Sequence, residues 1–555
     1  MRQRPLMSFL AATVMMLLLI SITGCNARNS YSVDTSGTTE SPGAAIFVSK
    51  NAPVMVSVLV NPDKLPALQR DAELSKLKTS LLANTEIDYK QDIQPWLGKE
   101  VTLAVSTLDI DRNAENGRQP GYLMALAIQQ PEKSREFVEL FFSKRALAGA
   151  TLTVEQYKGV KLIYDTQEDK SPDEHSNSSS SNSIAGAVVG DRFVLFANHL
   201  KVLREAINNV QAAELNLTSS IQYQQASKQL PTGALALTFL NLPTVAEWQG
   251  LKLTSQTYDS QMLSLVSKPK GLLAETTLIA TEDLTSSAQL SKPVGALQYI
   301  PGSAALAVAG TNLSSLSNSN LAQLWFQATT AISGSQEDVI SRLAKPLGDW
   351  QKSTGINWKE DIFSWVRGEY AIGLLPREQT TPEWVFVAEK SETTPGGIAR
   401  LDEIALSNGL SLNSINLDTQ KITAWTELTT NKIDVKDRQS FTIQAKVDGV
   451  HTTVGNYEIF TNSIETMDEV LKNMENSLIN NRNFQDSIAA IPQPNEGYVY
   501  LDWTKSQPIL ESEFPILKLL KVVGKPFFHN LRSLTVSSYG SDKTLLKGGI
   551  FFTTE

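Results

Sequence analysis

Side chains that commonly take part in chemistry are scarce in this sequence. The chain has 555 residues, with one cysteine and four histidines. A single cysteine forms neither an intrachain disulfide nor a four-cysteine zinc or iron–sulfur site. His199, His451 and His529 stand apart from carboxylates at metal-ligand spacing, and His175 lies in an acidic, serine-rich tract at 167–183. We therefore expect no metal site and no cofactor, with the histidines in loops, on the surface or capping helices.

No known catalytic motif accompanies these residues. Sequences typical of the nucleophile elbow, the zinc proteases, the dinucleotide-binding folds and the phosphate-binding loop are missing. Ser75 with Lys78, and Ser267 with Lys270, fit the Ser-x-x-Lys pattern, but the companion motifs of that enzyme class are absent. We predict no catalytic residue and no enzyme. A site of dispersed carboxylates would leave no such pattern, so a hydrolase stays open as an alternative.

The lone cysteine, Cys25, ends a segment with the pattern of an export signal. Two arginines precede an apolar run at 7–20, whose length suits a secretory signal and is short for a membrane span. The run leads into Ile-Thr-Gly-Cys at 22–25, which resembles the bacterial lipobox. The resemblance implies cleavage after Gly24 and lipidation of the Cys25 sulfur. A plain signal peptide or an uncleaved anchor helix is the alternative.

Composition places the rest of the chain in the globular class. Hydrophobic residues make up 41% and charged residues 19%, which disfavours wholesale disorder and a multi-span membrane protein. Residues 26–42 are rich in serine, threonine and asparagine, so we expect a flexible tether there. The net charge of −9 disfavours nucleic acid as a partner, because phosphate binding needs basic side chains.

The body of the chain contains an internal repeat. Residues 87–100 align with residues 356–369 without a gap. Other segments recur in the same order, among them 189–198 with 454–462 and 223–231 with 484–492. We therefore predict two homologous units, at 43–282 and 295–555, joined by a linker at 283–294 and preceded by the signal at 1–25.

The repeated segment, called the box below (residues 87–100 and 356–369), has a structural explanation. Asp92 and Asp361 are expected at the start of a short helix, where a carboxylate can cap free N–H groups. Ile93 and Trp96 then share one helix face in the first box, and Ile362 and Trp365 share one helix face in the second. An aromatic platform for a ligand is the alternative to this packing role.

Strand and helix patterns alternate within the first unit. We expect strands at 54–60, 101–108, 121–128, 151–157, 160–165, 193–196, 234–240 and 272–280, and helices at 131–148 and 200–210. Short turns between consecutive strands predict an α+β fold, with a largely antiparallel sheet and packed helices in each unit. In the second unit, the apolar segment 508–528 is expected to form a helix that opens at Pro515 and ends at 524–526.

The leader, the box and the Val-Gly-(Asp/Asn) entry at 189–191 and 454–456 together resemble a known family. This is the domain-of-unknown-function family 3352, found mostly in cyanobacteria, and the resemblance covers most of residues 43–555. It implies the architecture and an extracytoplasmic setting. It brings no catalytic residues that could be carried over to this chain.

Three functions are compatible with these observations. A membrane-tethered, extracytoplasmic and non-catalytic binding or assembly module fits best, because the repeat contains no polar constellation that chemistry would need. Its partners would be a membrane, reached through the N-terminal lipid, and another protein. A carrier of a lipid or other apolar ligand is the first alternative, and a hydrolase with a dispersed site is the second.

Overall fold

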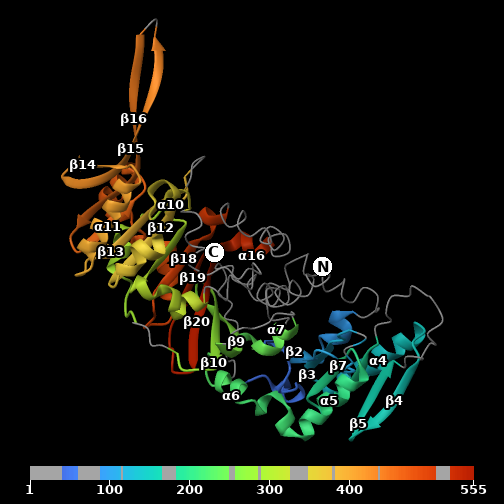
Figure 1. The fold of residues 1–555 in the computed structure, drawn as a ribbon. Coiled ribbons are helices and arrows are strands. Elements are labelled where there is room, and N and C mark those ends of the chain that lie inside the picture. The colour runs from blue at the N-terminus through green and yellow to red at the C-terminus, as the bar shows by residue number, and fades with distance from the viewer. Residues whose placement is uncertain are drawn as a thin grey trace. The chain divides into compact units, whose positions relative to one another are not determined.

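A computed structural model describes residues 41–60, 88–113, 115, 117–165, 183–248, 257–284, 289–324, 348–377, 382–435, 438–507 and 525–554. The signal, the tether, Cys25, Gly24 and His175 lie outside these residues. Backbone contacts divide the chain into two units, one formed mainly by residues up to 284 and the other mainly by those from 285 onward. Strands and helices are mixed throughout, and the strands pair antiparallel, so the fold is α+β (Figure 1).

The first unit is built on one antiparallel sheet. Its strands are β1 (Val54–Val58), β2 (Leu97–Thr107), β3 (Gly121–Ile128), β4 (Leu152–Tyr157), β5 (Val160–Asp165), β6 (Ala185–Val189), β7 (Phe193–Ala197), β8 (Ala234–Asn241), β9 (Tyr258–Lys268) and β10 (Gly271–Ala280). They lie side by side in the order β10-β9-β8-β1-β2-β3-β7-β6-β5-β4.

Helices and short helical turns cover both faces of this sheet. They are η1 (Gly43–Phe47), η3 (Tyr89–Ile93), α4 (Pro131–Leu147), α5 (Leu200–Gln211), η5 (Ala213–Leu215), η6 (Leu217–Ser219), α6 (Ile221–Ser227) and α7 (Leu242–Trp248). Alternate residues of a strand point to opposite faces. Met55 of β1 accordingly packs with η1, α5 and α6, while Val54 and Val56 pack beside α7. Because β1 is buried on both faces, every one of its residues is apolar or hydrogen-bonded.

The second unit repeats this order of strands. Its strands are β11 (Leu306–Thr311), β12 (Glu369–Leu375), β13 (Glu383–Glu389), β14 (Ser411–Leu417), β15 (Gln420–Val435), β16 (Arg438–Val454), β17 (Tyr457–Thr461), β18 (Tyr498–Asp502), β19 (Leu531–Ser538) and β20 (Leu545–Thr554). They lie in the order β20-β19-β18-β11-β12-β13-β17-β16-β15-β14. Adding ten to each strand number of the first unit reproduces this series.

Helices also flank the second sheet. They are η7 (Gly295–Tyr299), η8 (Leu313–Asn318), α10 (Gly348–Thr354), η10 (Trp358–Ile362), η11 (Phe363–Trp365), α11 (Thr394–Ser407), α12 (Ile464–Lys472), η12 (Met474–Asn476), η13 (Leu478–Asn480), α13 (Arg482–Ala489) and α16 (Lys525–Asn530). Met467 of α12 and Phe484 of α13 belong to the same core as Val385 of β13. No described helix in either unit is long and apolar enough to cross a membrane.

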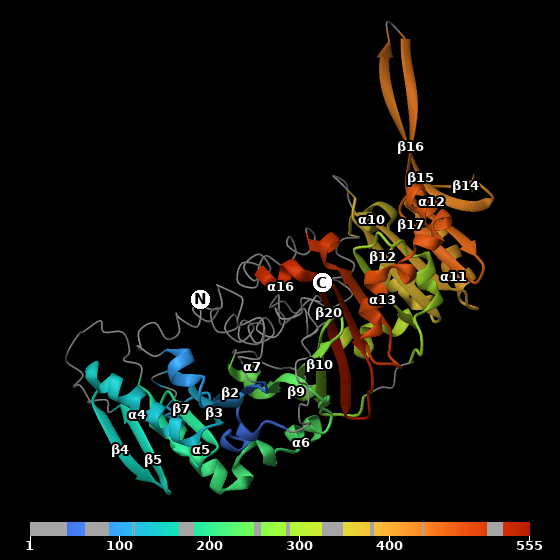
Figure 2. The same cartoon turned by 180° about the vertical axis from the view of Figure 1, so that it is seen from behind.

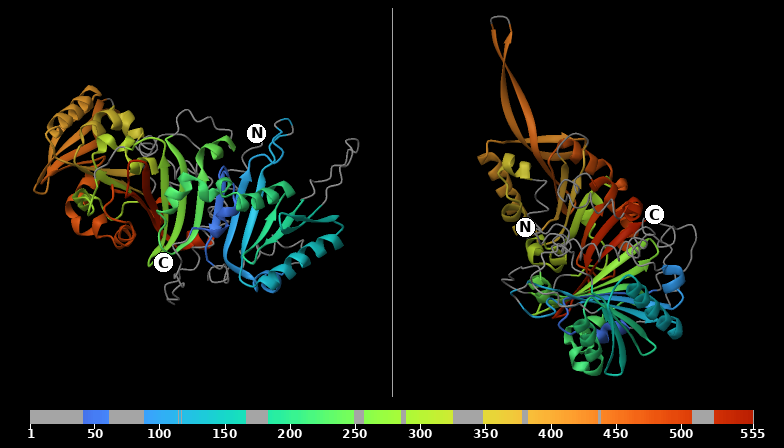
Figure 3. Two further views of the ribbon diagram at one scale, coloured as in Figure 1. Left: turned by 90° about the horizontal axis from the view of Figure 1, so that it is seen from below. Right: turned by 90° about the vertical axis from the view of Figure 1, so that its right-hand side faces the viewer.

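One pair of strands breaks the resemblance between the units. β15 and β16 continue past the neighbouring strands as a two-stranded ribbon, which extends beyond the sheet of the second unit (Figures 1, 2 and 3). The same connection in the first unit, between β5 and β6, comprises residues 166–184. The acidic, serine-rich sequence at 167–183 does not recur in the sequence of the second unit. The structure shows that the second unit carries its own, different elaboration at this connection.

Most expected elements of the first unit are confirmed, with shifts of a few residues at their ends. The turn of the expected hairpin at 151–165 falls on Lys158 and Gly159, both with positive φ. β6, β9, α6 and α7 were missed. In the second unit, residues 525–530 form α16, and the helix expected to open at Pro515 lies outside the described residues.

Helix α11 offers a matched pair of glycines. A Cβ atom at Gly397 would lie 2.5 Å from the Trp365 ring, whereas nothing lies within 4 Å of a Cβ at Gly396. We predict that Gly397→Ala lowers the free energy of unfolding by about 1–3 kcal/mol through overpacking. Gly396→Ala should be neutral or stabilising by up to about 1 kcal/mol, because alanine favours helix. Urea denaturation of both variants checks this, and equal effects would contradict the packing described.

Candidate functional site

The box forms the same hydrogen-bonded turn in both units. In the first unit the Asp92 carboxylate accepts a hydrogen bond from the Asp88 N–H at 2.8 Å, and the Trp96 indole donates to the Asp92 carbonyl at 2.7 Å. In the second unit Asp361 and Trp365 make the corresponding bonds at 2.8 and 2.7 Å, with Asn357 in place of Asp88. Each turn thus satisfies its own backbone groups with its own side chains.

The helical turn begins earlier in the box than the sequence suggested. η3 starts at Tyr89, and the residue that caps it is Asp88, whose carboxylate accepts from the Gln91 N–H at 2.8 Å. Asn357 caps η10 in the same way. Asp92 and Asp361 were expected at the helix start. They lie one turn later and reach back to the capping residue, because the turn is wound more widely than an α-helix.

The apolar residues of the box are packed inside the protein. Trp96 is 1% exposed, and its ring lies 5.0 Å from that of Phe137 in α4, with Ile93 in the same cluster. Ile362 and Trp365 are 1% and 7% exposed. These side chains form no open aromatic platform. The box therefore acts as a packing element that positions the start of the next strand.

The last residue of the box ties that strand to the beginning of its unit. The Glu100 carboxylate accepts from the N–H groups of Gly43 and Ala44, both at 2.9 Å, at the start of η1. Glu369 accepts from the Gly295 N–H at 2.7 Å, at the start of η7. A carboxylate at the N-terminus of a helical turn satisfies free N–H groups and opposes the partial positive charge there. The alignment of the two box segments shows that both end in glutamate, but it does not show which backbone groups these carboxylates bind.

A partly buried polar cluster holds the root of the ribbon, where β15 and β16 leave the sheet. Asp402 of α11 accepts from the Trp425 indole at 2.8 Å and contacts His451 Nε2 at 3.1 Å. His451 lies in β16 and is buried, with its ring stacked on Phe460. The expectation of a surface or capping histidine in a turn is therefore wrong for His451. For His199 it is confirmed, since its Nδ1 accepts from the Lys201 N–H and caps α5.

The bulge at the root explains why the ribbon turns away from the sheet. Trp425 pairs with Gly449, and Thr426 pairs with Val447, so Asp448 is an extra residue in β16. Such a bulge bends its strand and increases its twist. Glycine is required at 449, because a Cβ there would lie 2.4 Å from the Trp425 ring. Burial would raise the pKa of Asp402, but the hydrogen bonds from His451 and Trp425 outweigh it and hold the pKa below its ordinary value.

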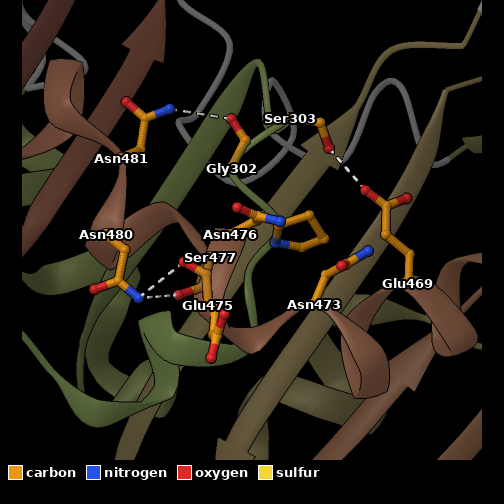
Figure 4. A pocket seen from close by; sticks show the side chains of 10 residues that line it. Gly302, Ser303, Glu469, Asn473, Glu475, Asn476, Ser477, Asn480 and Asn481 are labelled. Atoms are coloured by element: carbon orange, nitrogen blue, oxygen red, sulfur yellow. Dashed lines mark hydrogen bonds between the residues drawn. The ribbon is translucent and has the colours of Figure 1, made fainter.

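A hollow of about 340 Å³ opens in the second unit, away from the box (Figure 4). Most of its lining side chains are polar, and the lining comprises Pro301, Gly302, Ser303, Glu469, Asn473, Glu475, Asn476, Ser477, Asn480 and Asn481. Ser303 donates to Glu469 at 3.0 Å, and Arg377 holds the same carboxylate from behind at 2.8 Å. Pockets for apolar ligands are lined mainly by apolar side chains, so this hollow does not fit a lipid.

The described residues give little indication of a metal site or of a catalytic carboxylate. They contain no group of three or more histidine, cysteine, aspartate or glutamate side chains that could hold a metal ion. Glu383, near the hollow, is used structurally. Burial would raise its pKa, yet hydrogen bonds from Thr466 and Arg377 hold the pKa below its ordinary value.

Comparison with known proteins places the chain in a family. The family described as protein of unknown function DUF3352 matches residues 10–554, so the chain belongs to it. No curated protein matches the sequence. Among solved structures, crystal form I of TP0453 is similar over 46% of this chain and 90% of that one, with 9% identity and a TM-score of 0.26. Crystal form IV of TP0453 covers 45% and 83%, with 12% identity and a TM-score of 0.24.

The Asp402 cluster allows a pH-resolved test. We predict that Asp402→Ala costs about 1–3 kcal/mol of unfolding free energy, because the Trp425 and His451 nitrogens lose their acceptor. Asp402→Asn, which keeps an oxygen but no charge, should cost less. Since the folded-state pKa is lowered, the contribution of the charge is present above a pH of about 4 and is lost as the pH falls further.

Denaturation at several pH values measures these differences. The gap between the wild-type protein and Asp402→Asn should shrink below a pH of about 4. Asp418→Asn is the matched control, because the Asp418 side chain is 70% exposed and pairs only at the surface with Lys472. Its effect should stay within about 0.5 kcal/mol. A pH-independent gap for Asp402→Asn would contradict the role assigned to its charge.

Proposed function

We propose that this protein is a membrane-tethered, extracytoplasmic lipoprotein that acts as a non-catalytic binding or assembly module. The ribbon of β15 and β16 is the observation that carries the proposal. It displays large apolar side chains to solvent, with Leu428 55% and Ile443 69% exposed. Exposed apolar surface of this kind commonly marks sites where proteins interact.

We further propose that the two units are tandem homologous copies, with boundaries near 43–282 and 295–555. Their equal strand orders support this, as does the equal bonding of the box. A matching pair of hydrogen bonds outside the box also supports the duplication. Asn198 accepts from the N–H of Tyr122, and Asn462 accepts from the N–H of Trp384, at the end of matching strands. A scaffold duplicated in this way can differ in its connections while keeping its core, and binding residues commonly lie on connections.

The membrane tether rests on the sequence at 22–25. We predict that Cys25→Ser leaves a precursor that keeps its leader and takes up no labelled fatty acid, because the thiol is the lipidation site. The wild-type chain should incorporate the label and lose the leader after Gly24. Ser21→Ala serves as the control, since it changes the leader outside the four-residue motif. Normal labelling of the Cys25→Ser variant would overturn the lipoprotein assignment.

The binding role can be tested on membranes of the native host. The double variant Leu428→Asp/Ile443→Asp places charge on the apolar face of the ribbon, and we predict that it loses the crosslinked complexes formed by the wild-type chain. The control, Thr429→Asp/Gln444→Asp, adds the same charge to the opposite face and should keep them. Crosslinking followed by blotting measures both. Equal complexes in the two variants would contradict a binding role for the ribbon.

A further inference from the structure

The outer part of the ribbon has no neighbouring strand in the described part of the chain. β14 pairs with β15 only as far as Thr426, and β17 pairs with β16 only from Val450 onward. Starting at Thr426–Val447, the last pair that β14 flanks, ten residue pairs run out to Val435–Arg438 and join β15 to β16. An isolated two-stranded hairpin is at best marginally stable in water. This length of ribbon therefore gains from a surface to lie on.

The register gives the ribbon two unlike faces near its root. Residues directly opposite each other point to the same side, and neighbours along a strand alternate. Leu428 is opposite Ala445, and Ile443 is two residues further out, so these three share one face. Glu427, Thr429, Gln444 and Lys446 lie on the other face. The first face is apolar and exposed, and the second is polar, as suits a ribbon that docks through one side.

The area of the ribbon indicates what kind of partner can bind it stably. Ten pairs at about 3.4 Å per residue give a length of about 34 Å, and two strands give a width of about 10 Å. One face then offers roughly 340 Å², well below the 800 Å² or so per partner of a standard interface. Two copies that exchange ribbons would each contribute a ribbon face and the surface that receives the other ribbon. That doubles the area to roughly 700 Å² per partner, close to the standard size.

We propose that the apolar face of the ribbon docks on a second copy of this chain, in a two-fold arrangement in which each copy lends its ribbon to the other. This inference rests on the proposed function, since it names the partner of the same surface. Two-fold contacts are self-complementary, so one ribbon surface and one receiving surface suffice for both copies. The hydrogen bonds among Asp402, Trp425 and His451 fix the direction of the ribbon at its root. A ribbon held in this way loses less conformational entropy when it docks.

The mass of the full chain in a neutral detergent tests the inference. Size-exclusion chromatography with light scattering, corrected for bound detergent, should give twice the monomer mass for the wild-type chain. Leu428→Asp/Ile443→Asp should give the monomer, with a dimer dissociation constant raised at least tenfold. Thr429→Asp/Gln444→Asp should remain a dimer. Circular dichroism spectra of the three chains should agree, because all four positions lie on exposed parts of the ribbon.

Two results would overturn the second-copy inference, and they differ from the result that would overturn the proposed function. A wild-type monomer at every concentration would exclude the exchange, and a dimer that survives Leu428→Asp/Ile443→Asp would place the contact elsewhere. If the membrane crosslinks that depend on Leu428 and Ile443 contain another protein and no second copy, the binding role stands and only the partner changes. Crosslinks that do not depend on these residues remove the binding role itself.

Discussion

The closed hydrogen-bond circuit of the box is the interaction on which the architecture of each unit depends. The aspartate carboxylate binds the backbone before the turn, and the tryptophan indole binds the carbonyl of that aspartate. The first N–H groups of a helical turn have no partner within the turn, and the side chains of the box supply acceptors for them. With the turn closed, the following strand enters the sheet in a fixed direction, and its first glutamate reaches the opening turn of the unit. The box thereby links the second strand of each unit to the helical turn that precedes the first strand.

Pairing of polar groups also shapes the ribbon root. The Trp425 indole and the His451 ring are almost fully enclosed, and both turn to one carboxylate from α11. An unpaired buried donor costs more than a hydrogen bond contributes, so this arrangement admits few alternatives. The bulge at Asp448 then directs β15 and β16 away from their neighbours. The hydrogen bonds at the root thus set the direction of the ribbon, to which we assign the binding role.

The two units differ in one connection between neighbouring strands. The strand orders agree, and the capping bonds agree at the box and at the ends of β7 and β17. A clear difference lies in the connection between the fifth and sixth strands of each unit, which comprises residues 166–184 in one unit and carries the ribbon in the other. The strands on either side of this connection keep the same order in both units. The polar hollow, in contrast, is lined by the segment that leads into β11 and by the segment that joins β17 to β18.

The sequence by itself determined the α+β class, most elements of the first unit and the family, because hydrophobic period and turn residues are local properties. The spacing of Ile93 and Trp96 placed both on one helix face, and the structure packs them together. Tertiary structure alone decided that Glu100 caps η1, 56 residues away in sequence, and that Asp402 meets His451, 49 residues away. It also decided that β15 and β16 outrun the sheet. A strand's neighbours, and the burial of a histidine, depend on which segments meet in space, and a pattern read along one chain carries no information on that meeting.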